Sequence, residues 1–190
     1  MRRSAVKSAS LRRATWAETF QSADLAAVRI VARTARSSCG RICAIAITRL
    51  GNGWLYLFLF AIILVRTGLL GLHVICLCSA NVVIAHFLYP FIKRRYRRLR
   101  PFEVDLQLRS LLETLDEHSF PSGHAMTLAS VLTPIAIFWP ATATSSMLML
   151  ISVAWSRIAT AHHYPSDVLA GSAIGFCVAY PTTTYIDSFW

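Results

Sequence analysis

Residues 156–167 read SRIATAHHYPSD and lie between two apolar runs. The stretch carries Arg157, His162, His163 and Asp167. Charged side chains are costly beside membrane-type sequence, so residues of this kind are functional candidates by default. The stretch therefore predicts a polar site at the end of membrane-embedded helices.

The spacing within this stretch predicts a local geometry. Proline is tolerated in a first helical turn, so we expect Pro165 to begin a helix and His163 to lie just outside it. Asp167 is then expected to reach back to one ring nitrogen of His163. That bond would fix the tautomer and leave the other nitrogen free as a nucleophile. Arg157 adds a positive fork that suits phosphate. A short polar loop with a capping aspartate is the alternative.

The composition indicates one small membrane domain. The chain has 190 residues, of which 55% are hydrophobic, and its mean hydropathy is +0.52, which is high for a soluble protein. Apolar segments cover residues 54–65, 69–92, 125–139, 143–155 and 168–186. Several of them are shorter than the roughly 20 residues of a full span, so their tilts and boundaries stay open. We expect an all-α integral membrane helical bundle of five or six helices.

The N-terminal quarter of the chain is basic. The net charge is +10, and ten of the 19 Lys and Arg residues precede Gly51. Residues 1–16 predict a basic cytoplasmic tail, although their composition also resembles a mitochondrial-type transit peptide. Five arginines between Arg29 and Arg49 argue against a spanning helix and favour an amphipathic helix on the membrane interface. We therefore divide the chain into a tail with an interfacial helix at 1–50 and a membrane domain at 51–190.

The same patterns indicate the partners. Basic clusters beside apolar spans favour the membrane lipid bilayer, with its anionic headgroups, or phosphate. Nucleic acid is not expected, because the apolar remainder of the chain leaves no second soluble domain to bind it. The five cysteines form no paired metal-ligand pattern, which indicates inert thiols. No metal and no cofactor are expected, and the oligomeric state is left open.

A second polar stretch reads PSGH, residues 121–124, directly before an apolar segment. Pro121 opens a helix, and Ser122 and Gly123 leave backbone N–H groups bare at its N-terminus, which makes an anion site. His124 then stands in the first turn and can donate a proton to a leaving oxygen. An ordinary helix start with a surface histidine is the alternative.

A third polar stretch is the basic run from Lys93 to Arg100, in which six of the eight residues are Lys or Arg. Pro101 biases Arg100 away from helix, so the second apolar helix is expected to end about there. Crossings counted from the first apolar segment place all three polar stretches on one face of the membrane. Three cations, a helix N-terminus and two histidines on one face predict a phosphoryl-transfer site.

Together these stretches resemble the signature motifs of the type 2 phosphatidic acid phosphatase family in order and spacing. The matching residues are Lys93-x6-Arg100-Pro101, Pro121-Ser122-Gly123-His124 and Ser156-Arg157-x5-His163-x3-Asp167. The resemblance covers about residues 54–190. It implies a helical bundle with a metal-independent phosphatase site.

The resemblance also implies a role for each motif residue. Phosphate oxygens would be held by Lys93, Arg100, Arg157, Ser122 and the backbone N–H of Gly123. His163 would attack phosphorus and form a phosphohistidine, Asp167 would orient it, and His124 would protonate the leaving group. The motif spacing selects His163 over its neighbour His162. The remaining arginines of the basic run, Arg94, Arg95, Arg97 and Arg98, are expected to be mainly surface charge.

The expected function is that of a multi-pass membrane phosphatase that hydrolyses a lipid phosphate or an isoprenyl diphosphate. Alternatives are a lipid phosphotransferase, a vanadate-dependent oxidoreductase like the related haloperoxidases, and a non-catalytic protein that keeps the fold. The expected location is a bacterial inner membrane. The positive-inside rule places residues 1–50 and the site in the cytoplasm. An outward site, which many family members have, would require six crossings.

Overall fold

The computed structural model describes residues 2–114 and 116–188, with side chains for residues 16–114, 116–186 and 188. The basic tail expected over residues 1–16 therefore lies almost entirely outside the described side chains. The described part of the chain is helical and contains no strand. This confirms the all-α fold.

Eight helices and two short 3-10 turns follow one another along the described chain. The helices are α1 (Arg2–Thr34), α2 (Ser38–Leu50), α3 (Trp54–Thr67), α4 (Leu72–Tyr96), α5 (Pro101–Val104), α6 (Gly123–Phe138), α7 (Ala143–Ala159) and α8 (Pro165–Asp187). The turn η1 (Gly68–Gly71) joins α3 to α4, and η2 (Pro140–Thr142) joins α6 to α7. The five apolar segments correspond to α3, α4, α6, α7 and α8, with ends that differ by a few residues.

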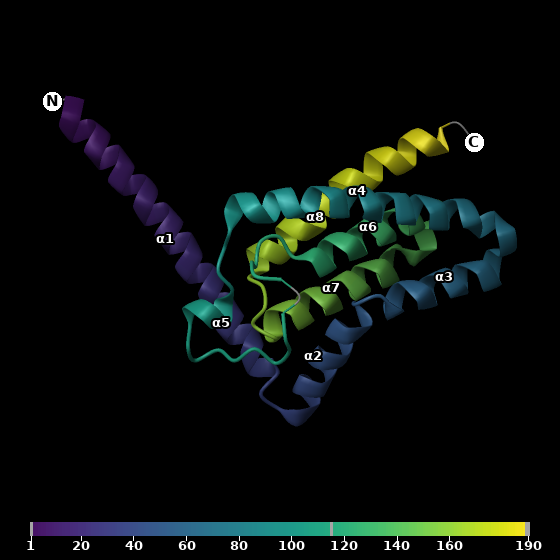
Figure 1. Ribbon diagram of the computed structural model, residues 1–190, viewed down its shortest axis with the longest axis horizontal. Coiled ribbons are helices and arrows are strands. Elements are labelled where there is room, and N and C mark those ends of the chain that lie inside the picture. The colour runs from purple at the N-terminus through teal and green to yellow at the C-terminus, as the bar shows by residue number, and fades with distance from the viewer. Residues whose placement is uncertain (1, 115, 189–190) are drawn as a thin grey trace.

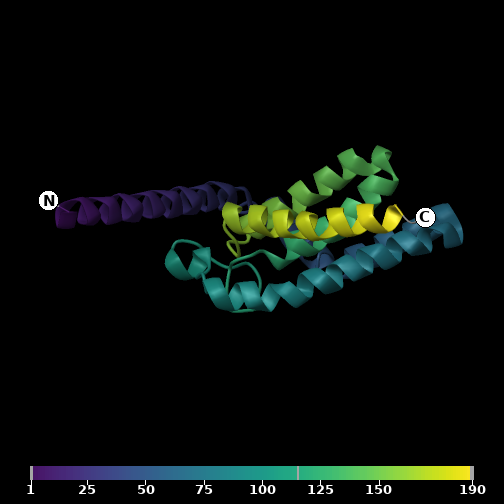
Figure 2. The ribbon, with the colours of Figure 1, turned by 90° about the horizontal axis from the view of Figure 1, so that it is seen from above.

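The bundle is built around α6, which packs most extensively against α8 and also against α4 and α7. In Figure 1 the connections that carry the three polar stretches lie at one end of the bundle, and η1 and η2 lie at the other. The helix α8 crosses α4 at an angle in Figure 1, and the two helices, seen from another side in Figure 2, contact each other. This arrangement brings the three polar stretches to one end, as the count of crossings predicts.

Two glycines of α8 allow it to approach α6 closely. A Cβ atom at Gly171 would collide with the backbone carbonyl of Ser122, and one at Gly175 would collide with that of Met126. Small residues four apart let two helices pack backbone to backbone. The same contact fixes two polar stretches to each other, because the Ser122 N–H donates to the Asp167 carbonyl at 3.0 Å. The helix contact therefore sets the relative position of the two halves of the site.

The outer surface of the bundle is apolar. Large hydrophobic side chains with exposed surface lie along α3, α4, α7 and α8, among them Phe58, Ile62, Val83, Phe87, Phe91, Met147, Ile151, Leu169 and Phe176. A smaller core, which includes Ile63, Val74, Leu128 and Val131, fills the interior. The segment Trp54–Val104 is long and apolar enough to cross a membrane, and Gly123–Phe138 is a shorter apolar helix. The fold is that of an integral membrane helical bundle.

The N-terminal region differs from a single interfacial helix. The chain turns at residues 35–37, and Ser37 caps α2 by accepting from the Gly40 N–H. Both helices pack against α7. Val28 lies in a core cluster with Ala161 and Tyr164 of the polar stretch 156–167. Residues 24–50 therefore support the site, and the division of the chain at residue 50 stays a prediction.

The second apolar helix ends earlier than Pro101 predicts. Arg97 adopts a left-handed conformation with φ 45°, which terminates α4 after Tyr96. Residues 97–100 then run as an irregular connection to α5, and Arg100 is extended. The earlier end matters for the site, because Arg97, Arg98 and Arg100 of the basic run then lie outside the helix.

Candidate active site

The three polar stretches surround one cavity of about 430 Å³. Its polar wall contains Arg100, Gly123, His124, Arg157 and His163 from the predicted set, together with Asp116. Lys93 and Ser122 are buried beside these residues. Tyr56 of α3 and Val82 of α4 line another side of the cavity. The cavity thus joins a cluster of cations and histidines to the helices of the membrane domain.

His163 is buried where the polar stretch 156–167 lines the cavity. Its Nδ1 atom lies 2.6 Å from the carbonyl oxygen of Ser119. A carbonyl oxygen can only accept, so Nδ1 carries the proton and Nε2 keeps its lone pair. Burial lowers the pKa of His163 well below its ordinary value, and the positive charges of Arg157, Arg100 and Lys93 lower it further. The ring is therefore neutral, which is the state that the predicted role as a nucleophile requires.

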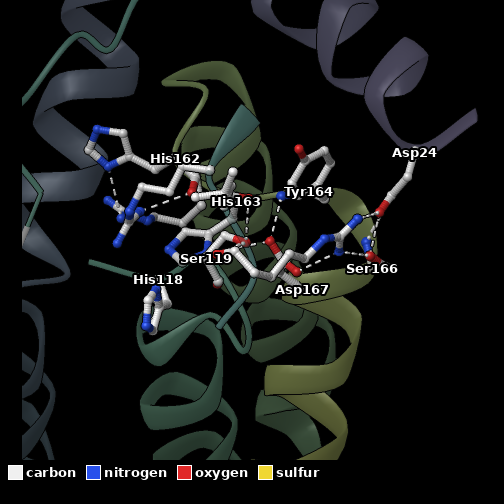
Figure 3. Close-up of polar contacts among 12 residues, drawn as sticks. Asp24, His118, Ser119, His162, His163, Tyr164, Ser166 and Asp167 are labelled. Carbon is white, nitrogen blue, oxygen red and sulfur yellow. Dashed lines mark hydrogen bonds and ion pairs between the residues drawn. The ribbon is translucent and has the colours of Figure 1, made fainter. Parts of the chain in front are cut away.

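The hydrogen bond expected between Asp167 and the ring of His163 is not formed. The distance from Nδ1 of His163 to Oδ2 of Asp167 is 3.8 Å, which is too long for a hydrogen bond. Asp167 instead accepts from the Tyr164 N–H at 2.8 Å and from Arg98 at 2.7 Å. In Figure 3 Ser119 lies beside His163 and Asp167, and its carbonyl takes the place predicted for the carboxylate. The carboxylate still lies within reach to stabilise positive charge on the ring.

Arg98 was predicted to be mainly surface charge, and this prediction is wrong. Its guanidinium donates to Asp24 and to Asp167, each at 2.7 Å, and to Ser166 at 2.7 Å. It also lies over the ring of Tyr164, with 3.7 Å to the centroid. Asp24 comes from α1 and also accepts from Ser166 (Figure 3). Arg98 and Asp24 thus hold the loop that carries His163.

A signal for Arg98 was present in the sequence. Pro101 forces Arg100 into an extended conformation, and side chains two apart on an extended segment share a face. Arg98 and Arg100 accordingly turn inward, whereas Leu99 between them is exposed. No comparable signal identifies Asp24, which lies 143 residues before Asp167 in the chain.

A carboxylate occupies the cationic part of the cavity. Asp116 accepts from Lys93, from Arg100 at 2.6 Å and from the Tyr89 hydroxyl at 2.8 Å. Burial alone would raise the pKa of Asp116, but Lys93, Tyr89 and Arg100 outweigh burial and hold the pKa below its ordinary value. Asp116 lies outside the three motifs and is not among the predicted site residues. Its charged oxygens lie where the motif cations would receive those of a phosphate.

Four buried polar side-chain atoms have no hydrogen-bond partner among the described residues. They are Arg100 Nε, Arg157 Nε, Ser122 Oγ and His118 Nδ1. A buried donor without an acceptor costs about 1–3 kcal/mol. Three of these four atoms belong to residues predicted to hold phosphate. The unpartnered donors of Arg100, Arg157 and Ser122 could therefore be satisfied by the oxygens of a bound oxyanion.

The second polar stretch places His124 in the first turn of α6, as predicted. Its Nε2 atom lies 2.7 Å from the Asn52 side-chain oxygen, in the turn between α2 and α3. An amide oxygen can only accept, so Nε2 carries a proton. The absence of a side chain at Gly123 leaves room for the Tyr89 hydroxyl. A Cβ atom at residue 123 would lie 2.9 Å from that oxygen, which is too close. The first turn of α6 directs its free backbone N–H groups toward the cavity end of the bundle.

His162 supports the site rather than lining the cavity. Its Nδ1 atom lies 3.0 Å from an Arg157 nitrogen, and its Nε2 atom lies 3.0 Å from the Leu112 carbonyl. Burial lowers the pKa of His162 to about 3, and the charges of Arg157 and Arg100 contribute. A neutral ring that accepts from Arg157 and donates to Leu112 satisfies both contacts. His162 thereby ties Arg157 to the loop between α5 and α6.

Comparisons with curated proteins identify lipid phosphatases as relatives. Decaprenylphosphoryl-5-phosphoribose phosphatase from Mycobacterium tuberculosis is 36% identical over 102 residues, which cover 53% of this chain and 54% of the relative. Lipid A 1-phosphatase from Rhizobium johnstonii is 31% identical over 99 residues, which cover 50% of this chain and 41% of the relative. The chain thus spans about half the length of the curated relatives it matches.

Two solved structures share the fold. A transmembrane PAP2 type phosphatidylglycerolphosphate phosphatase from Bacillus subtilis superposes with a TM-score of 0.68 at 24% identity, over 90% of this chain and 88% of that one. LpxE from Aquifex aeolicus superposes with a TM-score of 0.72 at 19% identity, over 85% and 94% of the two chains. The model of the PAP2 superfamily matches residues 72–190, which include all three motifs. This chain therefore belongs to the PAP2 superfamily.

Proposed function

We propose that this protein is a membrane phosphatase that removes a phosphate from a lipid phosphate or diphosphate through a phosphohistidine intermediate. The observation that carries the proposal is the set of unpartnered buried atoms on Arg100, Arg157 and Ser122. Arg100 and Arg157 line the same cavity as His163, and Ser122 is buried next to Gly123, which also lines it. The ring of His163 is neutral and is held by Ser119. A phosphoryl group is the ligand that would satisfy the donors and meet the nucleophile.

The chemistry follows from the positions of the two histidines. Nε2 of His163 attacks phosphorus, and the bond from phosphorus to the leaving oxygen breaks. His124, with both ring nitrogens protonated, gives its Nε2 proton to that oxygen and becomes neutral, so the lipid leaves as a neutral alcohol or as a shorter phosphate. Water then attacks the phosphohistidine, His124 takes a proton from it, and phosphate is released.

In this scheme the positive charges of the protein stabilise the negatively charged transition state. Phosphoryl transfer needs positioning and charge stabilisation more than covalent assistance. Arg100 and Arg157 would supply planar forks to the equatorial oxygens, and Lys93 a point charge. Asp167 stabilises the positive ring of His163 from 3.8 Å after attack. No step in this scheme uses a metal or a cofactor.

The walls of the cavity support a lipid substrate. Tyr56 and Val82 lie on helices whose outer faces carry exposed apolar side chains. A phosphate in the cavity could therefore keep its hydrocarbon tail among α3, α4 and the bilayer. The named substrates of the relatives, decaprenylphosphoryl-5-phosphoribose and lipid A, are phosphorylated lipids. We propose the same class here, in a multi-pass protein of a bacterial inner membrane.

The experiment that tests this function is phosphate release by the purified protein in detergent. The substrates are a polyprenyl diphosphate, lipid A, phosphatidylglycerol phosphate and phosphatidic acid, each with EDTA present. We expect release from at least one lipid, and none from the His163→Ala variant. Equal release by the variant, or release from no lipid by the wild type, would contradict the proposal. Transfer of label to an added lipid alcohol instead of water would identify a phosphotransferase.

A further inference from the structure

A second cavity, of about 230 Å³, lies at the corner between α1 and α2 and is lined by arginines. We call it the arginine hollow and define it by Arg29, Arg33, Arg36, Arg41 and Arg109. Two of these residues come from α1, one from the turn after it, one from α2 and one from the loop that follows α5. We call the cavity of about 430 Å³ that His163 lines the catalytic cavity. The hollow shares no lining residue with it.

The charge of the arginine hollow is largely uncompensated. Arg29 pairs with Asp105 at 2.6 Å. Among the described residues, the side chains of the other four arginines have no carboxylate partner. Like charges that line one concave surface repel one another, and a concave wall of low polarisability concentrates the field. An anion in the hollow would relieve this repulsion.

Part of the lining of the hollow is apolar and belongs to a packed core cluster. Ala35 and Ala159 are buried there, in a core cluster that Ala44 completes and against which Leu111 packs. This cluster packs the turn after α1 against α2 and the end of α7, beneath the arginines of the hollow. Such packing fixes the starting points of the side chains, which favours a defined site over a diffuse basic surface.

The geometry points to a phosphate-bearing anion as the ligand: we propose that the arginine hollow binds a phosphate group separately from the catalytic cavity. Guanidinium forks match phosphate oxygens in pairs. A volume of about 230 Å³ is roughly that of seven waters, which accommodates a phosphate. The phosphate of an anionic phospholipid headgroup and free phosphate share this chemistry. Exposed Ile30 and Ile42, next to Arg29 and Arg41 in the chain, offer contacts to acyl chains.

The test measures lipid binding to the purified full chain by native mass spectrometry. The variant Arg33→Gln/Arg109→Gln removes two charges from the hollow and leaves the Arg29 pair with Asp105 intact. The matched control, Arg94→Gln/Arg95→Gln, removes two exposed arginines of α4 that lie outside the hollow. Each protein is titrated with phosphatidylglycerol, with phosphatidylcholine and with inorganic phosphate. Neither variant changes a residue that lines the catalytic cavity. Lipid binding at that cavity therefore contributes equally to the affinities measured for the two variants.

We expect wild type and control to prefer phosphatidylglycerol to phosphatidylcholine, and the hollow variant to bind phosphatidylglycerol about 25-fold more weakly. This factor follows from roughly fivefold per basic side chain near a lipid surface. The variant Arg33→Lys/Arg109→Lys keeps the charges without the forks, and its affinity should fall between those of the hollow variant and wild type. Inorganic phosphate that displaces the lipid at equal concentration would identify free phosphate as the ligand. Equal affinities of hollow variant and control would overturn the proposal.

Discussion

Neutralising Asp116 should make the catalytic cavity a better phosphate site. The carboxylate of Asp116 takes hydrogen bonds from Lys93, Arg100 and Tyr89, which an incoming phosphate would also use. A phosphate must therefore displace Asp116 or share its donors. We expect the Asp116→Asn variant to lower the inhibition constant of inorganic phosphate, because the asparagine releases the two cations more easily.

The magnitude follows from the contacts. A hydrogen bond between charged groups contributes about 1.5–3 kcal/mol, and a neutral one about 0.5–1.5 kcal/mol. Removing the charge thus weakens the bonds to Lys93 and Arg100 by about 1 kcal/mol each. The Asp116 side chain is 33% exposed, so solvent screening reduces the sum to about 1 kcal/mol. This corresponds to roughly fivefold tighter phosphate binding.

The assay is competitive inhibition of p-nitrophenyl phosphate hydrolysis by inorganic phosphate. Glu117→Gln is the matched control, because it neutralises the adjacent exposed carboxylate, which forms no ion pair among the described residues. Because the pKa of Asp116 lies below its ordinary value near 4, its carboxylate is ionised at every pH above that value. The difference between variant and wild type should thus persist from roughly pH 5 to 8 and shrink only at lower pH. An unchanged or higher inhibition constant in Asp116→Asn would refute the reasoning.

Further predictions concern the support of the site, its acid and its orientation. Arg98→Lys should lower kcat about tenfold or more with little change in KM, because Lys cannot bridge the carboxylates of Asp24 and Asp167. Arg95→Lys should leave kcat and KM unchanged. Equal effects of the two substitutions would count against the bridging role of Arg98. His124→Ala should reduce hydrolysis of a lipid phosphate far more than that of p-nitrophenyl phosphate, whose leaving group needs no proton. Similar losses on both substrates would exclude the general-acid role. A cysteine at Leu106, which is 93% exposed, should resist a membrane-impermeant maleimide in intact cells if the site is cytoplasmic. Ready labelling would place the site outside and favour six crossings.

Much of the fold follows from the sequence because hydrophobic runs and prolines carry the information. The apolar segments locate α3, α4, α6, α7 and α8, and Pro165 marks the start of α8 as predicted. The one-sided arrangement of the polar stretches then follows from connectivity alone. Motif spacing selects His163 and His124, which line one cavity. Each of these inferences needs only neighbours in the chain.

The contacts that the sequence analysis missed join distant parts of the chain. Asp24 reaches Arg98 across 74 positions, and Asn52 reaches His124 across 72. No local period or motif links such pairs. The carbonyl of Ser119 replaces the carboxylate of Asp167 at the His163 ring, and a backbone oxygen leaves no mark in sequence. Only the packing of the loops against each other determines which acceptor comes close enough.

The central claim is that Nε2 of His163 becomes phosphorylated during turnover. It can be tested by rapid acid-free quenching of the enzyme with a substrate that carries a radiolabelled phosphate, followed by mapping of the labelled peptide. We predict a transient label that is stable to base and lost in acid, on the peptide that contains His163. The His163→Ala variant should carry none, although it should still bind phosphate through Arg100 and Arg157. Label of undiminished yield in that variant, or a label confined to another peptide, would contradict the account.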